Sequence, residues 1–441
     1  MIHALRWPAL AIALAIAVAS PARAQGALSL RDAVLLARDN SLAAQASREQ
    51  LQGAIATRQA TIAGAFPTLS LSTSPTYSSL PPNVAAVFSG GAFGSLNIPG
   101  FPAEGTYTDT TVSGNMVLFD AFATRDAIKL ADTQVLMQRL GASLAEQDAE
   151  TQAAVAYFDV LRAQGLADVA RTTLQQMQEH LRIGNLRMQA GAGTKAEVLQ
   201  LRAQVAQSQG ALTSANNAVN LARLNLANVL NAPLGDRPLD AEPPVPQLAV
   251  SVETALSRSL PQRPELKQAE LKEQLDQAQE SLTSRGLWPH LIGHTSYSFR
   301  GMAQGIFAAG VTLDWTLFDS FQTREKMLAQ QHQAQADALL LQQTRQRLAL
   351  EVRQQYENRE DARSREASAR EALASAQEAY RLALDRFRAG VAAPYELTDV
   401  QTTLIQSEND YIQSLDDYRV AEIRLARALG VDLASFLGAA R

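Results

Sequence analysis

The sequence has no cysteine in its 441 residues. Disulfide bonds and a lipid-modified N-terminal cysteine are therefore excluded. After the N-terminal segment it also has no window of 18 apolar residues without charge, so no membrane-spanning helix is expected. Neither charge sign dominates, with 39 Lys and Arg against 44 Asp and Glu. This mild acidity gives no indication of a nucleic-acid partner.

Proline is absent from two long stretches. The chain has 17 prolines, yet none lies between Pro102 and Pro233 or between Pro289 and Pro394. Because proline inside a helix removes a hydrogen bond and clashes with the preceding turn, these spans predict very long helices. Residues 120–189 alone would form a helix about 100 Å long at about 1.5 Å per residue.

Residues 1–24 are predicted to be a signal peptide. Arg6 precedes the apolar run from Leu10 to Ala19, and Ala22-Arg23-Ala24 has the small residues of a cleavage site. The alternative, a membrane anchor, would need about 20 apolar residues, and this run is shorter. Cleavage would remove Arg6 and Arg23 and change the formal charge from -5 to -7. The mature chain is therefore expected to be exported.

A duplicated motif divides the mature chain into two repeats. Leu118-Phe119-Asp120-Ala121-Phe122 returns 199 residues later as Leu317-Phe318-Asp319-Ser320-Phe321, and the register then holds for over a hundred residues. The first repeat is assigned to residues 25–231 and the second to 250–431. A proline-rich linker, 232–249, joins them, and 432–441 form a tail.

Each repeat is predicted to contain two strands, at about 66–78 and 106–118 and at about 288–300 and 305–317. Phe307, Val311 and Leu313 alternate with small or polar residues. Strands of about ten residues with one apolar and one polar face are typical of a transmembrane β-barrel. Two soluble hairpins packed on a core are the alternative.

The helical segments are predicted to pair as coiled coils. Helices are expected from residue 28 to 64 and from residue 250 to the Trp288-Pro289 pair, followed by the long spans. On the returning segments, ten positions in each repeat follow an alternating spacing of three and four, which is a strong coiled-coil signal. These positions are Val198, Leu201, Val205, Ser208, Leu212, Ala215, Val219, Ala222, Leu226 and Val229, and Leu397, Val400, Leu404, Ser407, Tyr411, Ser414, Tyr418, Ala421, Leu425 and Ala428.

No motif for catalysis or for a cofactor is recognised. There is no nucleophile elbow and no HExxH sequence, so the chain is not expected to be an enzyme. His290 and His294 are the one pair that suggests a metal. In a strand they would lie on one face about 13 Å apart, which is too far to share an ion. Polar lining of a channel is their expected role, and no metal or cofactor is expected.

Several features occur in the same order in both repeats. They are the openings Leu28 to Ala37 and Val250 to Leu256, the pairs Phe66-Pro67 and Trp288-Pro289, the duplicated Leu-Phe-Asp motifs, and the helix turns Arg187 to Gly191 and Arg386 to Gly390. In these features the sequence resembles the outer membrane efflux protein family, the TolC-like channel-tunnels. The resemblance covers essentially the whole mature chain. It implies an α+β membrane protein: a homotrimer whose four strands per chain form a twelve-stranded β-barrel, continued by a long coiled-coil α-helical barrel.

The resemblance also implies a function and partners. Such ducts lie in the cell outer membrane with a long periplasmic extension. They join a periplasmic adaptor and an inner-membrane pump of RND, ABC or MFS type, in efflux or in type I secretion. A periplasmic coiled-coil scaffold without a pore is the alternative hypothesis. The sequence does not identify the cargo or the cognate pump.

The turns between the long helices are the expected functional ends. The tip residues expected to contact the adaptor are Arg187, Gly191, Ala192, Arg386, Gly390 and Ala392. Glu396 and Asp399 share a helix face, and with Glu197 they are the candidate periplasmic gate. Their alternative role is to complement the positive end of their helix. In the family, acids at the positions of Glu396 and Asp399 line the entrance. The chain departs from TolC at Phe387 and Ala392, where TolC has a latching tyrosine and arginine.

Overall fold

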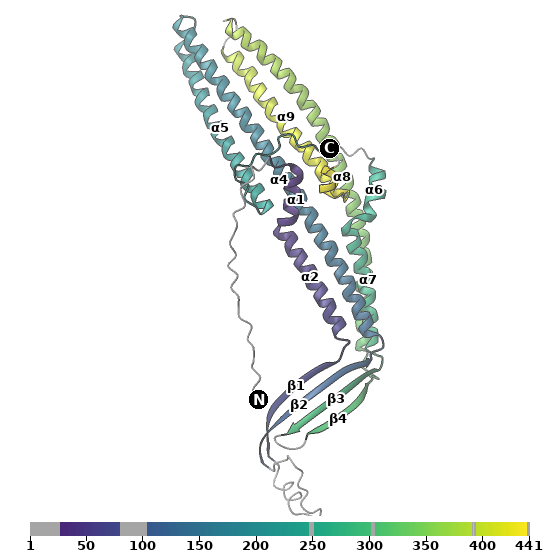
Figure 1. Cartoon of the computed structure of the whole chain (residues 1–441). Coiled ribbons are helices and arrows are strands. Elements are labelled where there is room, and N and C mark those ends of the chain that lie inside the picture. The colour runs from purple at the N-terminus through teal and green to yellow at the C-terminus, as the bar shows by residue number, and fades with distance from the viewer. Residues whose placement is uncertain are drawn as a thin grey trace, which may run out of the picture.

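The computed structural model describes residues 27–79, 104–246, 251–300, 305–389, 391 and 394–438. The predicted signal peptide lies outside these residues. The chain is elongated, with a small sheet at one end and two long helical hairpins at the other (Figure 1). Shorter helices lie alongside the hairpins between these ends. Within the described residues, no helix is both long and apolar enough to cross a membrane.

The N-terminal segment forms two helices where the sequence predicted one. α1 (Leu30–Asn40) ends at Ser41, and α2 (Leu42–Ala63) begins there. Ser41 has an extended backbone, and its side chain accepts a hydrogen bond from the backbone N–H of Ala44. The Arg48 side chain donates to the carbonyl oxygen of Arg38 at 2.9 Å, which satisfies one of the last carbonyls of α1. The break is therefore capped on both sides.

The matching segment of the second repeat is also broken. α6 (Val252–Ser259) leads through the 3₁₀ turn η1 (Leu260–Gln262) into α7 (Pro264–Arg285). Pro264 stands at the first position of α7, where its missing N–H costs no helical hydrogen bond. The expectation of one uninterrupted helix is therefore wrong in both repeats.

Four antiparallel strands form one sheet in chain order: β1 (Thr68–Ser79), β2 (Glu104–Phe119), β3 (His290–Arg300) and β4 (Ile306–Asp314). β2 pairs with β3, so the sheet is continuous across the two repeats. β1 and β4 are its outer strands.

The two faces of this sheet differ in chemistry along every strand. One register row crosses all four strands as Leu71, Val112, Tyr297 and Phe307. The next row has Ser70, Ser113 and Ser296, and the hydroxyl groups of Ser70 and Ser113 are 2.7 Å apart. Leu71 and Phe307 are 70% and 68% exposed. The described part of a single chain thus leaves an apolar sheet face uncovered.

β4 ends earlier than the sequence predicted. The alternation suggested a strand to Leu317, but the last pair in the ladder is His290 with Asp314. Pro289 precedes β3 and has no N–H to donate, so the ladder stops there. The indole N–H of Trp315 instead donates to the carbonyl oxygen of Leu287 at 3.2 Å.

Each repeat continues from its strands into a long helical hairpin. α4 (Ala123–Gln189) pairs with α5 (Lys195–Leu230), and α8 (Gln322–Arg388) pairs with α9 (Pro394–Ala428). All twenty positions predicted for the two coiled-coil seams are buried or half-buried, which confirms that prediction. α4 also packs against α9, so the two hairpins lie side by side.

The linker between the repeats packs onto the short segment that precedes α1. Leu28 and Leu239 form an isolated parallel bridge, and the phenol of Tyr157 in α4 donates to the carbonyl oxygens of Leu28 and Asp240 at 2.8 and 2.9 Å. Tyr157 and Leu28 are both fully buried in the main hydrophobic core. α10 (Leu433–Gly438) closes the same core.

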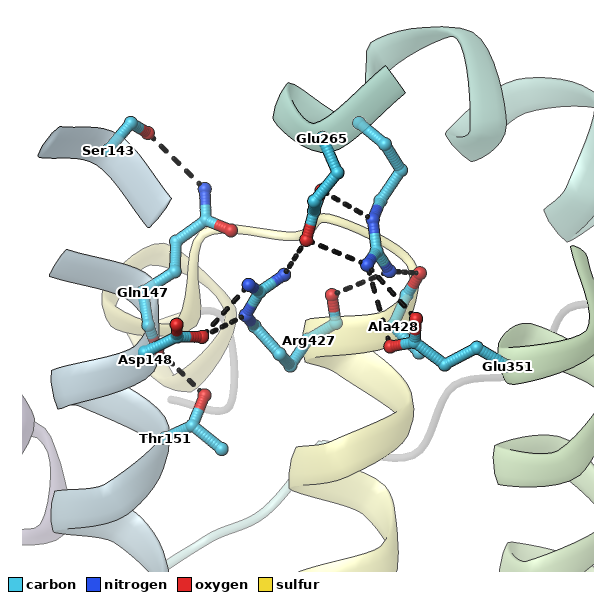
Figure 2. Close-up of polar contacts among 9 residues, drawn as sticks. Ser143, Gln147, Asp148, Thr151, Glu265, Glu351, Arg427 and Ala428 are labelled. Carbon is cyan, nitrogen blue, oxygen red and sulfur yellow. Dashed lines mark hydrogen bonds and ion pairs between the residues drawn. The ribbon is translucent and has the colours of Figure 1, made fainter. Parts of the chain in front are cut away.

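A network of ion pairs and hydrogen bonds around the buried Arg263 joins helices of both repeats (Figure 2). Arg263, 2% exposed, donates to Glu265 at 2.9 Å and to the carbonyl oxygen of Ala428 at the end of α9. Arg427 forms ion pairs with Glu265 at 3.1 Å and with Asp148 of α4 at 2.9 Å. These contacts fix α7 and the end of α9 against the first repeat.

Candidate functional site: the helix tips

The tip of the first hairpin is turned by a glycine. Gly191 has a φ of +73°, a conformation that glycine adopts without strain. The N–H groups of Gly191 and Ala192 donate to the carbonyl oxygens of Met188 and Arg187 at 3.1 and 2.8 Å, which closes the end of α4. Ala192 is exposed. In the second hairpin, Gly390 and Ala392 lie outside the described residues.

Glu197 takes part in the start of α5. Its carboxylate accepts from the backbone N–H of Thr194, and the Thr194 hydroxyl accepts from the N–H of Glu197, both at 3.3 Å. This is a capping box. The helix-end role that the sequence left open therefore accounts for the contacts of Glu197.

Glu396 and Asp399 lie together at the start of α9. Both border a shallow recess that Gln200 of α5 also lines. The Glu396 carboxylate is 3.7 Å from the guanidinium of Arg386, and Asp399 is exposed. The recess thus brings the predicted gate acids next to the first hairpin, with one of them partly compensated by an arginine.

A cluster of aromatic and cationic side chains joins the two hairpins near their tips, and we call it the cross-repeat cluster. It consists of His180 and Arg187 of α4 with Tyr380 and Phe387 of α8. His180 Nε2 is 3.2 Å from the Tyr380 hydroxyl, and its ring lies 6.2 Å from that of Phe387. The guanidinium carbon of Arg187 lies 5.1 Å from the Phe387 ring centroid, within the range of a cation–π contact.

Burial sets the charge state of this cluster. His180 is 2% exposed, and burial lowers its pKa from 6.5 to about 4. The negative charge of Glu179 raises the pKa, and the positive charge of Arg388 lowers it further. His180 is therefore neutral at pH 7 and packs as part of an apolar contact.

Sequence reasoning missed His180. It placed Tyr380 and Phe387 only on the expected coiled-coil seam of the descending helix, and it noted Phe387 also as a departure from the latch of TolC. The signal available was a break in the repeat: Phe387 occupies the position of Met188, and Tyr380 that of Leu181. Phe387 is 1% exposed, whereas Met188 is 36% exposed. The coiled-coil positions of α8 therefore contact the neighbouring hairpin. In α4 the last such position, Met188, is not buried.

The described residues contain no group of three or more His, Asp or Glu side chains that could hold a metal ion. His294 lies on the polar sheet face, with Nδ1 3.4 Å from the Thr312 hydroxyl, and its ring packs over Gly310. Its contacts are those of a packed polar side chain.

Comparison with known sequences identifies the family. Residues 33–232 and 255–431 match the family described as outer membrane efflux protein. A 143-residue segment is 32% identical to the outer membrane efflux protein BepC of Brucella suis biovar 1. That segment covers 32% of this chain and 31% of BepC, so it spans about a third of that relative.

Solved structures agree in fold over nearly the whole chain. The outer membrane protein VceC of Vibrio cholerae aligns with a TM-score of 0.73 and 17% identity, covering 91% of this chain and 96% of VceC. The CmeC outer membrane channel of Campylobacter jejuni aligns with a TM-score of 0.76 and 14% identity, covering 91% and 85%. The family match extends over both repeats and most of the sequence, and the chain therefore belongs to the outer membrane efflux protein family.

Proposed function

We propose that three copies of this chain form an exit duct in the outer membrane. The observation that carries the proposal is the open four-stranded sheet, which leaves one apolar face exposed and in which β1 and β4 have no second partner strand among the described residues. An open edge is not tolerated in lipid, and membrane barrels have at least eight strands. Three copies would supply twelve strands and close the sheet.

The helices support the same arrangement. In each chain α5 and α8 flank the inner pair α4 and α9. Both flanking helices expose leucines, including Leu221 and Leu224 of α5 and Leu350 and Leu382 of α8, all 51% to 66% exposed. Packing α5 of one copy against α8 of the next would bury them at about 25 cal/mol per Å² of apolar area. Repeated three times, this contact would close a tube of twelve helical segments.

The hairpin tips are the proposed contact with a periplasmic adaptor. They lie at the end of the molecule farthest from the sheet, with Gly191 and Ala192 exposed (Figure 1). The adaptor would connect the duct to an inner-membrane pump, so that cargo leaves the cell without entering the periplasm. Glu396 and Asp399 of three copies would place six carboxylates near one constriction, an arrangement that favours cations.

Cell fractionation and planar-bilayer recording test this function together. The full-length protein should be recovered from the outer membrane as a detergent-resistant trimer, and the trimer should give discrete conductance steps. A soluble periplasmic species that gives no conductance would support the scaffold hypothesis and refute the duct. The cargo can then be identified by measuring which candidate compounds accumulate in cells that lack the protein.

A further inference from the structure

The apolar sheet face ends in exposed aromatic side chains where the strands join the helices. Phe119 pairs with Leu291 and so lies on the apolar face. The ring of Phe122 contacts Phe119 edge-on at 6.2 Å, and Phe318 and Phe321 repeat this contact at 5.6 Å in the second repeat. Phe122 and Phe321 are 58% and 60% exposed. Each aromatic pair therefore extends the apolar face beyond the end of the sheet.

The backbone at these junctions is held in a conformation that side chains other than glycine disfavour. Ala121 and Phe122 have φ values of 53° and 72°, and Ser320 and Phe321 have 54° and 67°. The Asp120 and Asp319 carboxylates accept from the N–H groups of Thr124 and Thr323 at 2.6 and 2.8 Å, which caps α4 and α8. The helix ends are thus already satisfied within the chain, while the turn projects each phenylalanine outward.

Exposed cations continue from these aromatics along the helices. Arg125 follows Phe122 by three residues and Lys129 follows by four more, a spacing that places all three on one side of α4. Arg324 stands in the same relation to Phe321. All three cations are exposed, and among the described residues they form no ion pair, whereas the nearby Arg285 pairs with Asp126 at 3.1 Å. A cation in the first helical turn opposes the helix dipole, and both repeats have an arginine there.

We propose that the two strand–helix junctions bind the anionic headgroups of membrane phospholipids. We call the exposed Phe122 with Arg125 and Phe321 with Arg324 the junction surface. Transmembrane β-barrels carry girdles of aromatic residues at both membrane interfaces. Arginine side chains extend along apolar surface and place their charge in the headgroup layer. The junction surface has both, in that order, directly beyond an apolar sheet face. Its ligand is an anionic phosphodiester lipid of the leaflet nearest the helices.

This inference rests on the proposed duct, because only a membrane-inserted sheet brings the junctions to a bilayer. The test uses the full-length protein in neutral detergent, mixed with equal amounts of phosphatidylglycerol and phosphatidylcholine, and counts bound lipids by native mass spectrometry. An arginine near an anionic membrane surface contributes about fivefold in affinity. The wild-type protein should therefore retain phosphatidylglycerol several-fold over phosphatidylcholine.

Replacing both arginines, Arg125→Gln with Arg324→Gln, should reduce this preference to near one. Lys195→Gln with Arg202→Gln is the matched control, since it removes the same charge from exposed positions on α5 far from the sheet. The control should keep the wild-type ratio. An unchanged ratio in the junction variant, or a preference abolished by millimolar inorganic phosphate, would overturn the proposal.

Trimer mass and conductance, measured on the same samples, distinguish a failure of the junction proposal from a failure of the proposed duct. If the wild-type protein forms conducting trimers without a lipid preference, the junction proposal fails and the duct stands. If it forms no trimer, the duct itself is refuted, and the junction proposal with it.

Discussion

Protonation of His180 should separate the two hairpins near their tips. The side chain is buried between α4 and α8, where it contacts Tyr380 and Phe387. The folded pKa is about 4, below the ordinary value of 6.5 that His180 would regain when the hairpins open. The closed contact is therefore fully stable above about pH 6.5 and loses stability as the pH falls, because the open state binds the proton first.

The two pKa values set the size of the effect. At pH 5 the closed contact loses about 2 kcal/mol relative to pH 7, or roughly 20-fold in the opening equilibrium, and at pH 4 about 3 kcal/mol. Glu150 and Asp416 act in the opposite direction, since burial raises their pKa values to about 7 and about 6 and acid stabilises their folded environment. Glu150 lies about 45 Å along α4 from His180 at 1.5 Å per residue. The measurement must therefore report on the opening of the hairpins near His180 and not on the stability of the whole protein.

Hydrogen exchange of backbone amides around residues 376–387 of α8 provides this measurement. After correction for intrinsic exchange, protection in this segment should fall roughly 20-fold between pH 7 and pH 5. In His180→Gln, which has no titratable ring, this fall should largely disappear. His332→Gln, at an exposed position of α8, should behave as wild type. An equal fall in protection in wild type and His180→Gln would refute the reasoning.

Three further predictions concern the arginine network, the gate and the tips. Arg263→Met should destabilise the protein by about 1–3 kcal/mol, because it removes the buried hydrogen bond to the carbonyl oxygen of Ala428 and leaves the half-buried carboxylate of Glu265 with Arg427 as its remaining partner; a drop in melting temperature should show this, with a smaller drop for Arg263→Lys. Glu396→Gln with Asp399→Asn should reduce cation selectivity and block by multivalent cations in bilayer recordings; unchanged selectivity would leave these acids as helix-end residues. Cysteine at Ala192 should crosslink to the adaptor in cells, and crosslinks found only near the sheet would contradict the tip assignment.

The duplicated pattern predicted much of the fold because the relevant signals are local. Alternation around Phe307 and Val311 indicated a strand with one apolar face, and the register rows of the sheet have that face. The three-four spacing from Val198 to Val229 predicted a seam that the structure buries or half-buries throughout. In both cases the period alone determines which side chains share a face.

The break at Ser41 could not be predicted in the same way, whereas Pro261 and Pro264 were an unused local signal for the break in the second repeat. Ser41 lies in a sequence of high helix propensity, and the end of α1 beside it also has a distant partner. The side-chain amide of Asn231 donates to the carbonyl oxygen of Asn40 at 3.2 Å across 191 residues. Tertiary contacts of this kind override local propensity.

The site was predicted less completely than the fold. The tips were found from their glycines, and Gly191 has the left-handed backbone expected at a helix end. The cross-repeat cluster was missed because the two repeats were assumed to pack alike. His180 is buried in part by the other repeat, through its contact with Tyr380 of α8, and no spacing within α4 carries that information.

The central claim is that three copies of the chain form the duct. The number of chains in the purified complex tests this claim most directly. The full-length protein, extracted from outer membranes in mild detergent, should give a native mass of three mature chains, as a twelve-stranded barrel requires. A particle that contains a single chain would contradict the account, because four strands cannot close a barrel in lipid.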